Sequence, residues 1–326
     1  MELTSYSLDK LTLRREGSHT ELILQWLNSA LPASVALGEL AESTPKTYRR
    51  AATLWLRHLE GNDTPTPANV REWVAGMRTT SISASTISTY LAAIKAFYRW
   101  AEATNSYPNI ARAVRAPRVV KDSPLPCPSA QEVSGMFHSI DSNCLKGKRD
   151  RALLAVMYST AMRCISLCRA TVGDVDLSAS TIRHQPKGHR VKDALAILSP
   201  SAVDAMSDYL VARGTVSTDA PLFVAVGNHH STSAGLTSRA MRALIVTLTE
   251  GIGLARRSSE GHIRNPGCYS AHSIRRAAVT AAAEQLGMDA AQTLAGHASV
   301  DTTRRAYARV NKYRQLQATA HVLDFT

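Results

Sequence analysis

Residues 151–198 read RALLAVMYSTAMRCISLCRATVGDVDLSASTIRHQPKGHRVKDALAIL, and within them a helical pattern gives way to an extended one. The run ALLAVMY predicts a buried helix over 149–158. After the turn signal at Gly173, the stretches 180–184 and 191–198 predict two strands joined by a loop that contains glycine. This pattern is typical of a β-hairpin, so we expect a unit that is mainly helical with a small β-sheet.

A second group of helices is predicted upstream of this segment. Residues 44–45 and 66–67 are both Thr-Pro, which places an N-cap residue before a proline that begins a helix. Residues 87–101 carry apolar side chains at alternating spacings of four and three, which predicts a third helix. A further helix is expected at 21–31. These segments together predict a compact, all-helical unit.

A basic, proline-rich segment separates the two units. Three closely spaced prolines disfavour a regular helix there: Pro124, Pro126 and Pro128. Four basic residues lead into it with no acidic residue between them: Arg112, Arg115, Arg118 and Lys121. These side chains are expected either on a solvated helix end or along a phosphate backbone, and both interpretations stay open.

The composition narrows the class of protein. A net charge of +12 indicates a polyanionic partner or an anionic membrane surface. No apolar run approaches the ~18 residues of a membrane span, and the N-terminus is too polar for a secretory signal. We therefore expect a soluble intracellular protein with no membrane partner.

The five cysteines are odd in number and scattered, which argues against a disulfide framework. Cys164 and Cys168 would share a helix face, and His184 is near enough in sequence to suggest zinc. No second ligand pair follows them, so small core thiols are the preferred interpretation.

Several residues have the chemistry of a phosphate site, although each is a weak signal alone. Arg163 lies among apolar neighbours, where a guanidinium needs an anion or a structural ion pair. Lys187 at the hairpin tip would ordinarily be an exposed turn residue. His272 and Arg275, three apart on a predicted helix capped by Ser270, lie on one face. Pairs of this kind are usually solvated.

The C-terminal region adds two more candidates. Gly296 would end a short helix and leave His297 on the turn after it. Asp301 is expected to cap the next helix, which carries Tyr307 about two turns in. A single tyrosine there is more often a packing residue. Gly287 is a further expected helix stop.

Taken in order, these residues resemble the tyrosine recombinase (phage integrase) family. TAMRCISLCRATVGDVDL, residues 160–177, is similar to the family's segment around its first catalytic arginine, and PKGHR falls at its hairpin lysine. HSIR matches the HxxR motif, and AGH matches the LGH motif. The resemblance places six catalytic positions at Arg163, Lys187, His272, Arg275, His297 and Tyr307.

The resemblance implies a domain organisation as well. Residues 43–116 are similar to the family's helical core-binding domain, and the catalytic resemblance covers 129–310. We therefore expect an N-terminal extension, a helical DNA-binding domain, a linker, and a catalytic domain with a C-terminal tail, at 1–40, 41–116, 117–128 and 129–326 respectively.

Three departures from the family pattern stand out. Ser166 occupies a position where the family often has Glu or Asp, and Ala161-Met162 replaces the usual Gly-Leu. Ten residues separate His297 from Tyr307 where nine is commoner. One extra residue rotates a helical position by about 100°, so the insertion is expected before the helix. Tyr313 is the other nearby tyrosine.

The family's chemistry supplies roles for these residues. The two arginines would clamp the scissile phosphate, and His297 would add a hydrogen bond. His272 would accept the tyrosine proton or donate to the phosphate. Tyr307 would form a 3′-phosphotyrosyl bond, and Lys187 would protonate the leaving 5′-hydroxyl. The resemblance implies no requirement for ATP, a metal or another cofactor.

The resemblance also implies partners and a setting. Double-stranded DNA would be clamped between the two domains, and four protomers would exchange strands on paired sites through a Holliday junction. Monomers or dimers are expected off DNA, with accessory DNA-bending proteins. The expected role is integration and excision of a mobile element in the bacterial cytoplasm, at the nucleoid.

Other interpretations stay open at this point. A type IB topoisomerase uses the same residues, and a non-catalytic DNA-binding protein would share the fold. A basic metal- or RNA-binding protein is a more distant alternative. The tail is apolar for a chain end and is expected to dock on a neighbouring protomer or on its own domain, through Leu316, Val322, Leu323 and Phe325.

Overall fold

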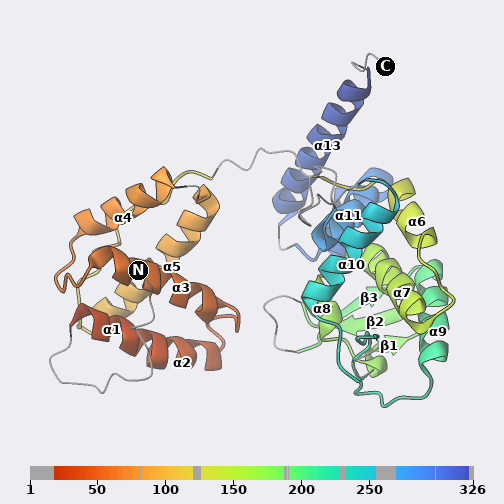
Figure 1. Cartoon of the computed structure of the whole chain (residues 1–326), viewed down its shortest axis with the longest axis horizontal. Coiled ribbons are helices and arrows are strands. Elements are labelled where there is room, and N and C mark those ends of the chain that lie inside the picture. The colour runs from red at the N-terminus through yellow and green to blue at the C-terminus, as the bar shows by residue number, and fades with distance from the viewer. Residues whose placement is uncertain are drawn as a thin grey trace. The chain divides into compact units, whose positions relative to one another are not determined.

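The chain divides between Lys121 and Asp122 into two units (Figure 1). The structure is a computed structural model, and the residues it describes are 18–80, 82–119, 126–186, 189, 191–227, 233–254, 269–297 and 299–322. Each unit has a hydrophobic core of its own.

The first unit is entirely helical in its described part. It contains α1 (His19–Gln25), a π-helical turn (Trp26–Ala30), α2 (Leu31–Ala36), α3 (Thr44–Leu59), α4 (Pro67–Thr79) and α5 (Ala84–Ala103). The helices expected from the sequence are present. Thr66 caps α4 with the help of Asn69. Thr44, however, is the first residue of α3 and not its cap, because Ser43 precedes the helix.

Aromatic side chains hold this unit together. Trp55, Phe97 and Tyr98 are fully buried where α3 packs on α5. The Tyr98 hydroxyl lies 2.8 Å from His19 Nε2 and accepts a hydrogen bond from Trp55 Nε1 at 3.2 Å. Burial lowers the pKa of His19 to about 4, so this imidazole is neutral. The network therefore fixes α1 to α3 and α5.

The second unit combines helices with one small sheet. Its elements are α6 (Ala130–His138), α7 (Leu145–Thr160), α8 (Cys164–Cys168), a 3-10 turn (Val172–Asp174), β1 (Val175–Asp176), β2 (Thr181–His184), β3 (Ala194–Ile197), α9 (Pro200–Arg213), α10 (Ser238–Gly251), α11 (Ala271–Leu286), α12 (Met288–Ala295) and α13 (Val300–Val322). The sheet is antiparallel in the order β1-β2-β3. The predicted class, mainly helical with a small sheet, is confirmed.

The expected hairpin is present, with two differences. Its second strand begins at Ala194, later than expected, and His184 pairs with that residue. A short strand that was not expected, β1, pairs Val175 with Ile182. The sheet lies against the core through Ile182, which is fully buried.

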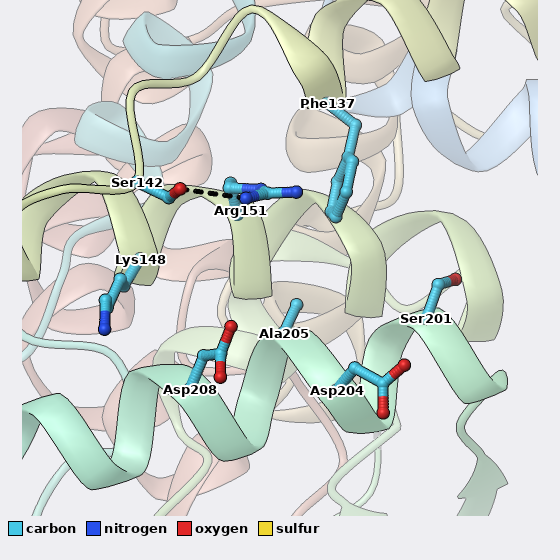
Figure 2. Close-up of a pocket in the computed structure, with 8 residues that line it drawn as sticks. All are labelled: Phe137, Ser142, Lys148, Arg151, Ser201, Asp204, Ala205 and Asp208. Carbon is cyan, nitrogen blue, oxygen red and sulfur yellow. Dashed lines mark hydrogen bonds between the residues drawn. The ribbon is translucent and has the colours of Figure 1, made fainter.

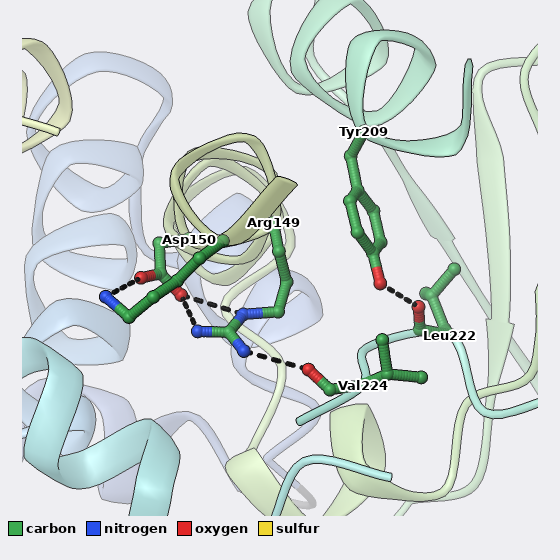
Figure 3. A network of polar contacts seen from close by, with 6 residues as sticks. Arg149, Asp150, Tyr209, Leu222 and Val224 are labelled. Atoms are coloured by element: carbon green, nitrogen blue, oxygen red, sulfur yellow. Dashed lines mark hydrogen bonds and ion pairs between the residues drawn. The ribbon is translucent and has the colours of Figure 1, made fainter. Parts of the chain in front are cut away.

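Helix α7 is the centre of this unit. Its run ALLAVMY supplies Leu153, Leu154 and Val156, all fully buried, and the helix packs along α9 (Figure 1). At its start, the buried Arg149 binds Asp150 and donates to the Val224 carbonyl at 2.9 Å (Figure 3). These bonds attach the chain between α9 and α10 to α7.

None of the described helices is long and apolar enough to cross a membrane. No group of three or more His, Cys, Asp or Glu side chains that could hold a metal ion is found in the described part of the chain.

Candidate active site

The first arginine of the site lies at a helix start. Helix α7 ends at Thr160, and Ala161 takes a left-handed conformation with φ 49° and ψ 24°. This turns the chain so that Arg163, half-buried, becomes the N-cap residue of α8. Glycine favours such a conformation. Here an alanine takes it, and its side chain is fully buried.

The second arginine is held by the ends of two other helices. Arg275 on α11 is 6% exposed, and its two terminal nitrogens donate to the carbonyls of Ala161 and Ala295. These carbonyls follow or end α7 and α12, where helices carry partial negative charge. No carboxylate pairs with Arg275 within the described residues. Burial, followed by the charge of Arg163, lowers its pKa to about 10, so it is still a cation at neutral pH.

The two histidines lie within the field of these arginines. His272 is exposed at the surface, but the protein packed around it partly desolvates the ring, and this lowers its pKa. The charges of Arg276, Arg275 and Arg163 lower the pKa further. Burial, Arg275 and Arg163 also lower the pKa of His297. Both imidazoles are therefore neutral near pH 7. The structure brings Arg163, Arg275, His272 and His297 together.

His297 is fixed from both sides. Gly296 ends α12 in a left-handed conformation, as expected from the sequence. The His297 backbone donates to Gln292 O at 3.3 Å, and Gln292 Nε2 donates to His297 O at 3.0 Å. Its Nδ1 lies 2.9 Å from Thr303 Oγ1. This last contact joins the histidine to α13.

Tyr307 lies on α13, four residues after Thr303. Residues four apart share a helix face, and Thr303 and Val310 on this face are fully buried against the unit. Tyr307 is half-buried. Asp301 does not cap the helix as expected: α13 begins at Val300, and Asp301 forms ion pairs with Arg304 and Arg305, one turn on.

Lys187 lies outside the described residues, as does the side chain of Tyr313. The strands that lead to and from Lys187 are described. Ser166 Oγ donates to Gln185 O at 2.7 Å, which joins the end of β2 to α8. On the return, Lys192 pairs with Asp174. The serine that replaces the family acid therefore supports the hairpin through a neutral hydrogen bond.

The basic residues before the linker belong to the first unit. Arg112 is exposed and pairs with Glu102 at 2.7 Å, whereas Arg115 and Arg118 are exposed without a partner among the described residues. Lys121 lies outside them. A role of these four basic residues in DNA binding stays a prediction.

Two hollows, of about 180 and 300 Å³, lie between α6, α7 and α9, and none of the residues that line them belongs to the arginine–histidine cluster. Figure 2 shows the smaller one, with Arg151 beside Phe137 on one side and Asp204 and Asp208 on α9. The Arg151 guanidinium lies 4.4 Å from the centre of the Phe137 ring.

Sequence reasoning passed over one residue of this site as a catalytic candidate. His184 ends β2, and its lowered pKa reports both Arg275 and Arg163 nearby. The available signal was its alternation with Ile182, which places an ionisable side chain on the buried face of the strand.

Comparison with known proteins agrees with the fold. Residues 129–314 match the model of the phage integrase family, and residues 37–105 match that of the phage integrase N-terminal SAM-like domain. The first match alone covers more than half of the chain. The chain therefore belongs to the phage integrase family, and its catalytic domain is that of a tyrosine site-specific recombinase that acts on DNA.

Curated relatives are similar over most of the chain. The tyrosine recombinase XerC of Corynebacterium glutamicum is 26% identical over 281 residues, which is 85% of this chain and 84% of that protein. The XerC of Herpetosiphon aurantiacus is 30% identical over 240 residues, or 72% of each chain.

Solved structures share the fold at low sequence identity. The Tn1549 transposon integrase in complex with transposon right end DNA has a TM-score of 0.65 and 14% identity, and covers 92% of this chain and 100% of that one. The lambda integrase bound to DNA has a TM-score of 0.61 and 16% identity, with 86% and 92% covered.

Proposed function

We propose that this chain cleaves and rejoins DNA strands through a covalent 3′-phosphotyrosyl bond to Tyr307. The observation that carries the proposal is the buried Arg275, which is held by two carbonyls and is paired with no carboxylate among the described residues. The Arg275 guanidinium therefore lies beside Arg163 without a counter-anion among the described residues. The planar donors of two guanidinium groups suit a phosphate.

In the proposed reaction, Arg163 and Arg275 bind the nonbridging oxygens of the scissile phosphate. Their fixed charges stabilise the charge that develops in the transition state. Tyr307 Oη attacks phosphorus, and the bond to the 5′-oxygen breaks. A 5′-hydroxyl from another strand reverses the step, because the phosphotyrosine retains a reactive phosphodiester.

Protons are moved by the remaining residues. A neutral His272 can accept the tyrosine proton, and its lowered pKa keeps it in that form. His297 donates to the phosphate from Nε2 when Nδ1 accepts from the Thr303 hydroxyl. Lys187 protonates the leaving 5′-oxygen, a role that rests on the resemblance to the family.

Recombination further needs an assembly on DNA. The proposed arrangement has a DNA-binding domain at 41–116, a linker at 117–128 and a catalytic domain from 129 onwards, with Arg112, Arg115, Arg118 and Lys121 along the phosphate backbone. Two bound protomers on each of two sites would form a tetramer around a Holliday junction. The lambda integrase dimer bound to a COC′ core site supports paired binding.

Integration and excision of a mobile element is the proposed role, at the nucleoid of a bacterium. The likeness to a transposon integrase bound to transposon DNA supports this role. The bacterial sources of the XerC relatives support the setting.

A nicked suicide substrate tests the nucleophile. The target duplex is first selected from random DNA with Tyr307→Phe protein, and a nick near the cleavage point then traps the covalent intermediate. Wild type and Tyr313→Phe should form a denaturation-resistant adduct, and Tyr307→Phe should form none. An adduct that persists in Tyr307→Phe would contradict the assignment, and tight binding without any adduct would favour a non-catalytic DNA-binding protein.

A further inference from the structure

His184 has incomplete hydrogen bonding in a polar environment. It is the last residue of β2 and is half-buried, and alternation along the strand places it on the same side as the fully buried Ile182. Its Nδ1 is buried and has no hydrogen-bond partner among the described residues. An unsatisfied buried group of this kind destabilises the folded protein. A position that retains one therefore needs a physical explanation.

The surrounding contacts place the end of β2, which carries this imidazole, close to the two arginines. The next carbonyl, that of Gln185, accepts the hydrogen bond from Ser166 on α8. Arg163 is the N-cap of that same short helix, and Arg275 donates to Ala161, two residues before it. The end of β2 and the two arginines thus meet at one short segment of chain.

The charges that face His184 come from three elements. Arg275 on α11 and Arg163 at the start of α8 oppose its protonation, whereas Asp193, before β3, and a backbone interaction with Gln185 favour it. Asp193 is exposed and already lies 2.8 Å from His189 Nδ1. Burial is the largest influence, followed by Arg275, and the net effect is a lowered pKa. The ring is therefore neutral at pH 7 before DNA binds.

We propose that His184 is a further catalytic residue of the phosphate site, which takes up a proton from solvent when the scissile phosphate binds and donates a hydrogen bond to it. The inference rests on the proposed function. A phosphodiester brings one negative charge, which offsets the repulsion from the arginines and favours the charged imidazole. One N–H bond forms on the ring as an O–H bond of a solvent hydronium ion breaks, and no other covalent bond changes.

Proton uptake on DNA binding is the direct test. Calorimetry in buffers of different ionisation enthalpy gives the number of protons bound per selected duplex near neutral pH. In the Tyr307→Phe background, which binds DNA without cleavage, His184→Gln should take up fewer protons than its parent. His138→Gln is the matched control, because that exposed histidine contacts Ser134 and Phe137 on its own helix and is not part of the arginine–histidine cluster. Equal uptake in the His184→Gln protein and its parent overturns the proposal.

Cleavage of the suicide substrate gives a second measurement. With Tyr307 intact, the His184→Gln protein should cleave the substrate about 10- to 100-fold more slowly, because it loses the hydrogen bond from a charged imidazole to the phosphate. Its rate should also respond less to a fall in pH than the wild-type rate. A purely structural histidine would change the rate without changing its pH dependence, and that result also counts against the proposal.

The test of His184 can be told apart from the test of the proposed function. If the His184→Gln protein fails to fold, the protonation of His184 is instead followed in Tyr307→Phe protein through the ¹⁵N chemical shifts of the His184 ring. A ring that stays neutral on DNA binding overturns the inference. A wild-type adduct together with unchanged uptake contradicts only the role of His184. Absence of a wild-type adduct contradicts the proposed function itself.

Discussion

At the scale of single residues, the site is defined by two arginines that pair with no carboxylate among the described residues. Arg275 donates to two carbonyls, and the nearby charge of Arg163 lowers its pKa. Burial of such a group is costly unless it is fully hydrogen-bonded. The carbonyls lower that cost and leave the charge available to a phosphate.

Arg275→Lys tests whether this geometry matters beyond charge. Lysine keeps a positive charge, but its ammonium lacks the planar fork that reaches both carbonyls. We expect suicide-substrate cleavage to fall by about 100-fold or more, with a lower melting temperature. Arg242→Lys is the control, since that exposed arginine donates to the Ser238 carbonyl of its own helix and does not bind the carbonyls that hold Arg275. Wild-type cleavage by Arg275→Lys would show that charge alone is sufficient.

At the scale of elements, short connections between helices position the catalytic groups. The turn from α7 to α8 carries Arg163, and the turn from α12 to α13 carries His297. Helix α7 leads directly into the turn that carries Arg163, and contacts near the start of α7 hold this helix in place. Its early residue Gly147 is buried directly against the chain at Asp141.

Gly147→Ala should disturb that anchor. An added Cβ would lie 1.6 Å from the Asp141 carbonyl oxygen, a backbone atom that cannot move without shifting the loop. We expect a loss of roughly 1–3 kcal/mol in unfolding free energy, as for other overpacked sites. Thermal unfolding followed by circular dichroism measures it.

Gly135→Ala is the matched control in the same unit. The added Cβ would meet only Ile252 at 3.7 Å, an ordinary contact, in the middle of α6. Helix propensity then predicts a gain of about 0.5–1 kcal/mol. Equal effects of the two substitutions would contradict the close approach at Gly147.

The His19 network makes the first unit sensitive to acid. The folded pKa of His19 is about 4 and its unperturbed value is 6.5, so the unfolded chain binds the proton more readily. Stability from this group is present above pH 6.5 and is lost as the pH falls toward about 4. His19→Gln should remove that part of the dependence.

Tryptophan fluorescence of the whole chain isolates this unit. All four tryptophans lie within it: Trp26, Trp55, Trp73 and Trp100. Denaturant unfolding followed by this signal should show a falling midpoint in wild type between pH 6.5 and 4 and a smaller fall in His19→Gln. Equal slopes would mean that other groups dominate the acid response.

At the scale of the whole molecule, the net charge of +12 predicts salt-sensitive DNA binding. Arg118→Gln should reduce the slope of log affinity against log salt by about 0.9, the value for one lost phosphate contact. Arg112→Gln should reduce it less, because that guanidinium already pairs with Glu102. Fluorescence anisotropy with Tyr307→Phe protein and the selected duplex measures both, and an unchanged slope in Arg118→Gln would remove that residue from the DNA contact.

Much of this protein follows from local sequence, because periodicity, caps and turn residues act over a few neighbours. The helices of both units, the hairpin and the left-handed Gly296 were predictable in this way. The order of the candidate catalytic residues was equally visible, although the role of each in the reaction is still a prediction. Helix starts were less certain, and the expected caps at Thr44 and Asp301 were wrong by one or two residues.

Only the tertiary structure decided which distant segments come close enough for their charges and hydrogen bonds to interact. No sequence pattern predicts that Arg275 donates to the carbonyls of Ala161 and Ala295. Nor does one predict that Ser166 donates to the Gln185 carbonyl, next to His184 at the end of β2. The lowered pKa values of the histidines also arise only when burial and the two arginines act together. Charge interactions and desolvation depend on distances through space, so residues more than a hundred positions apart become one site only on folding.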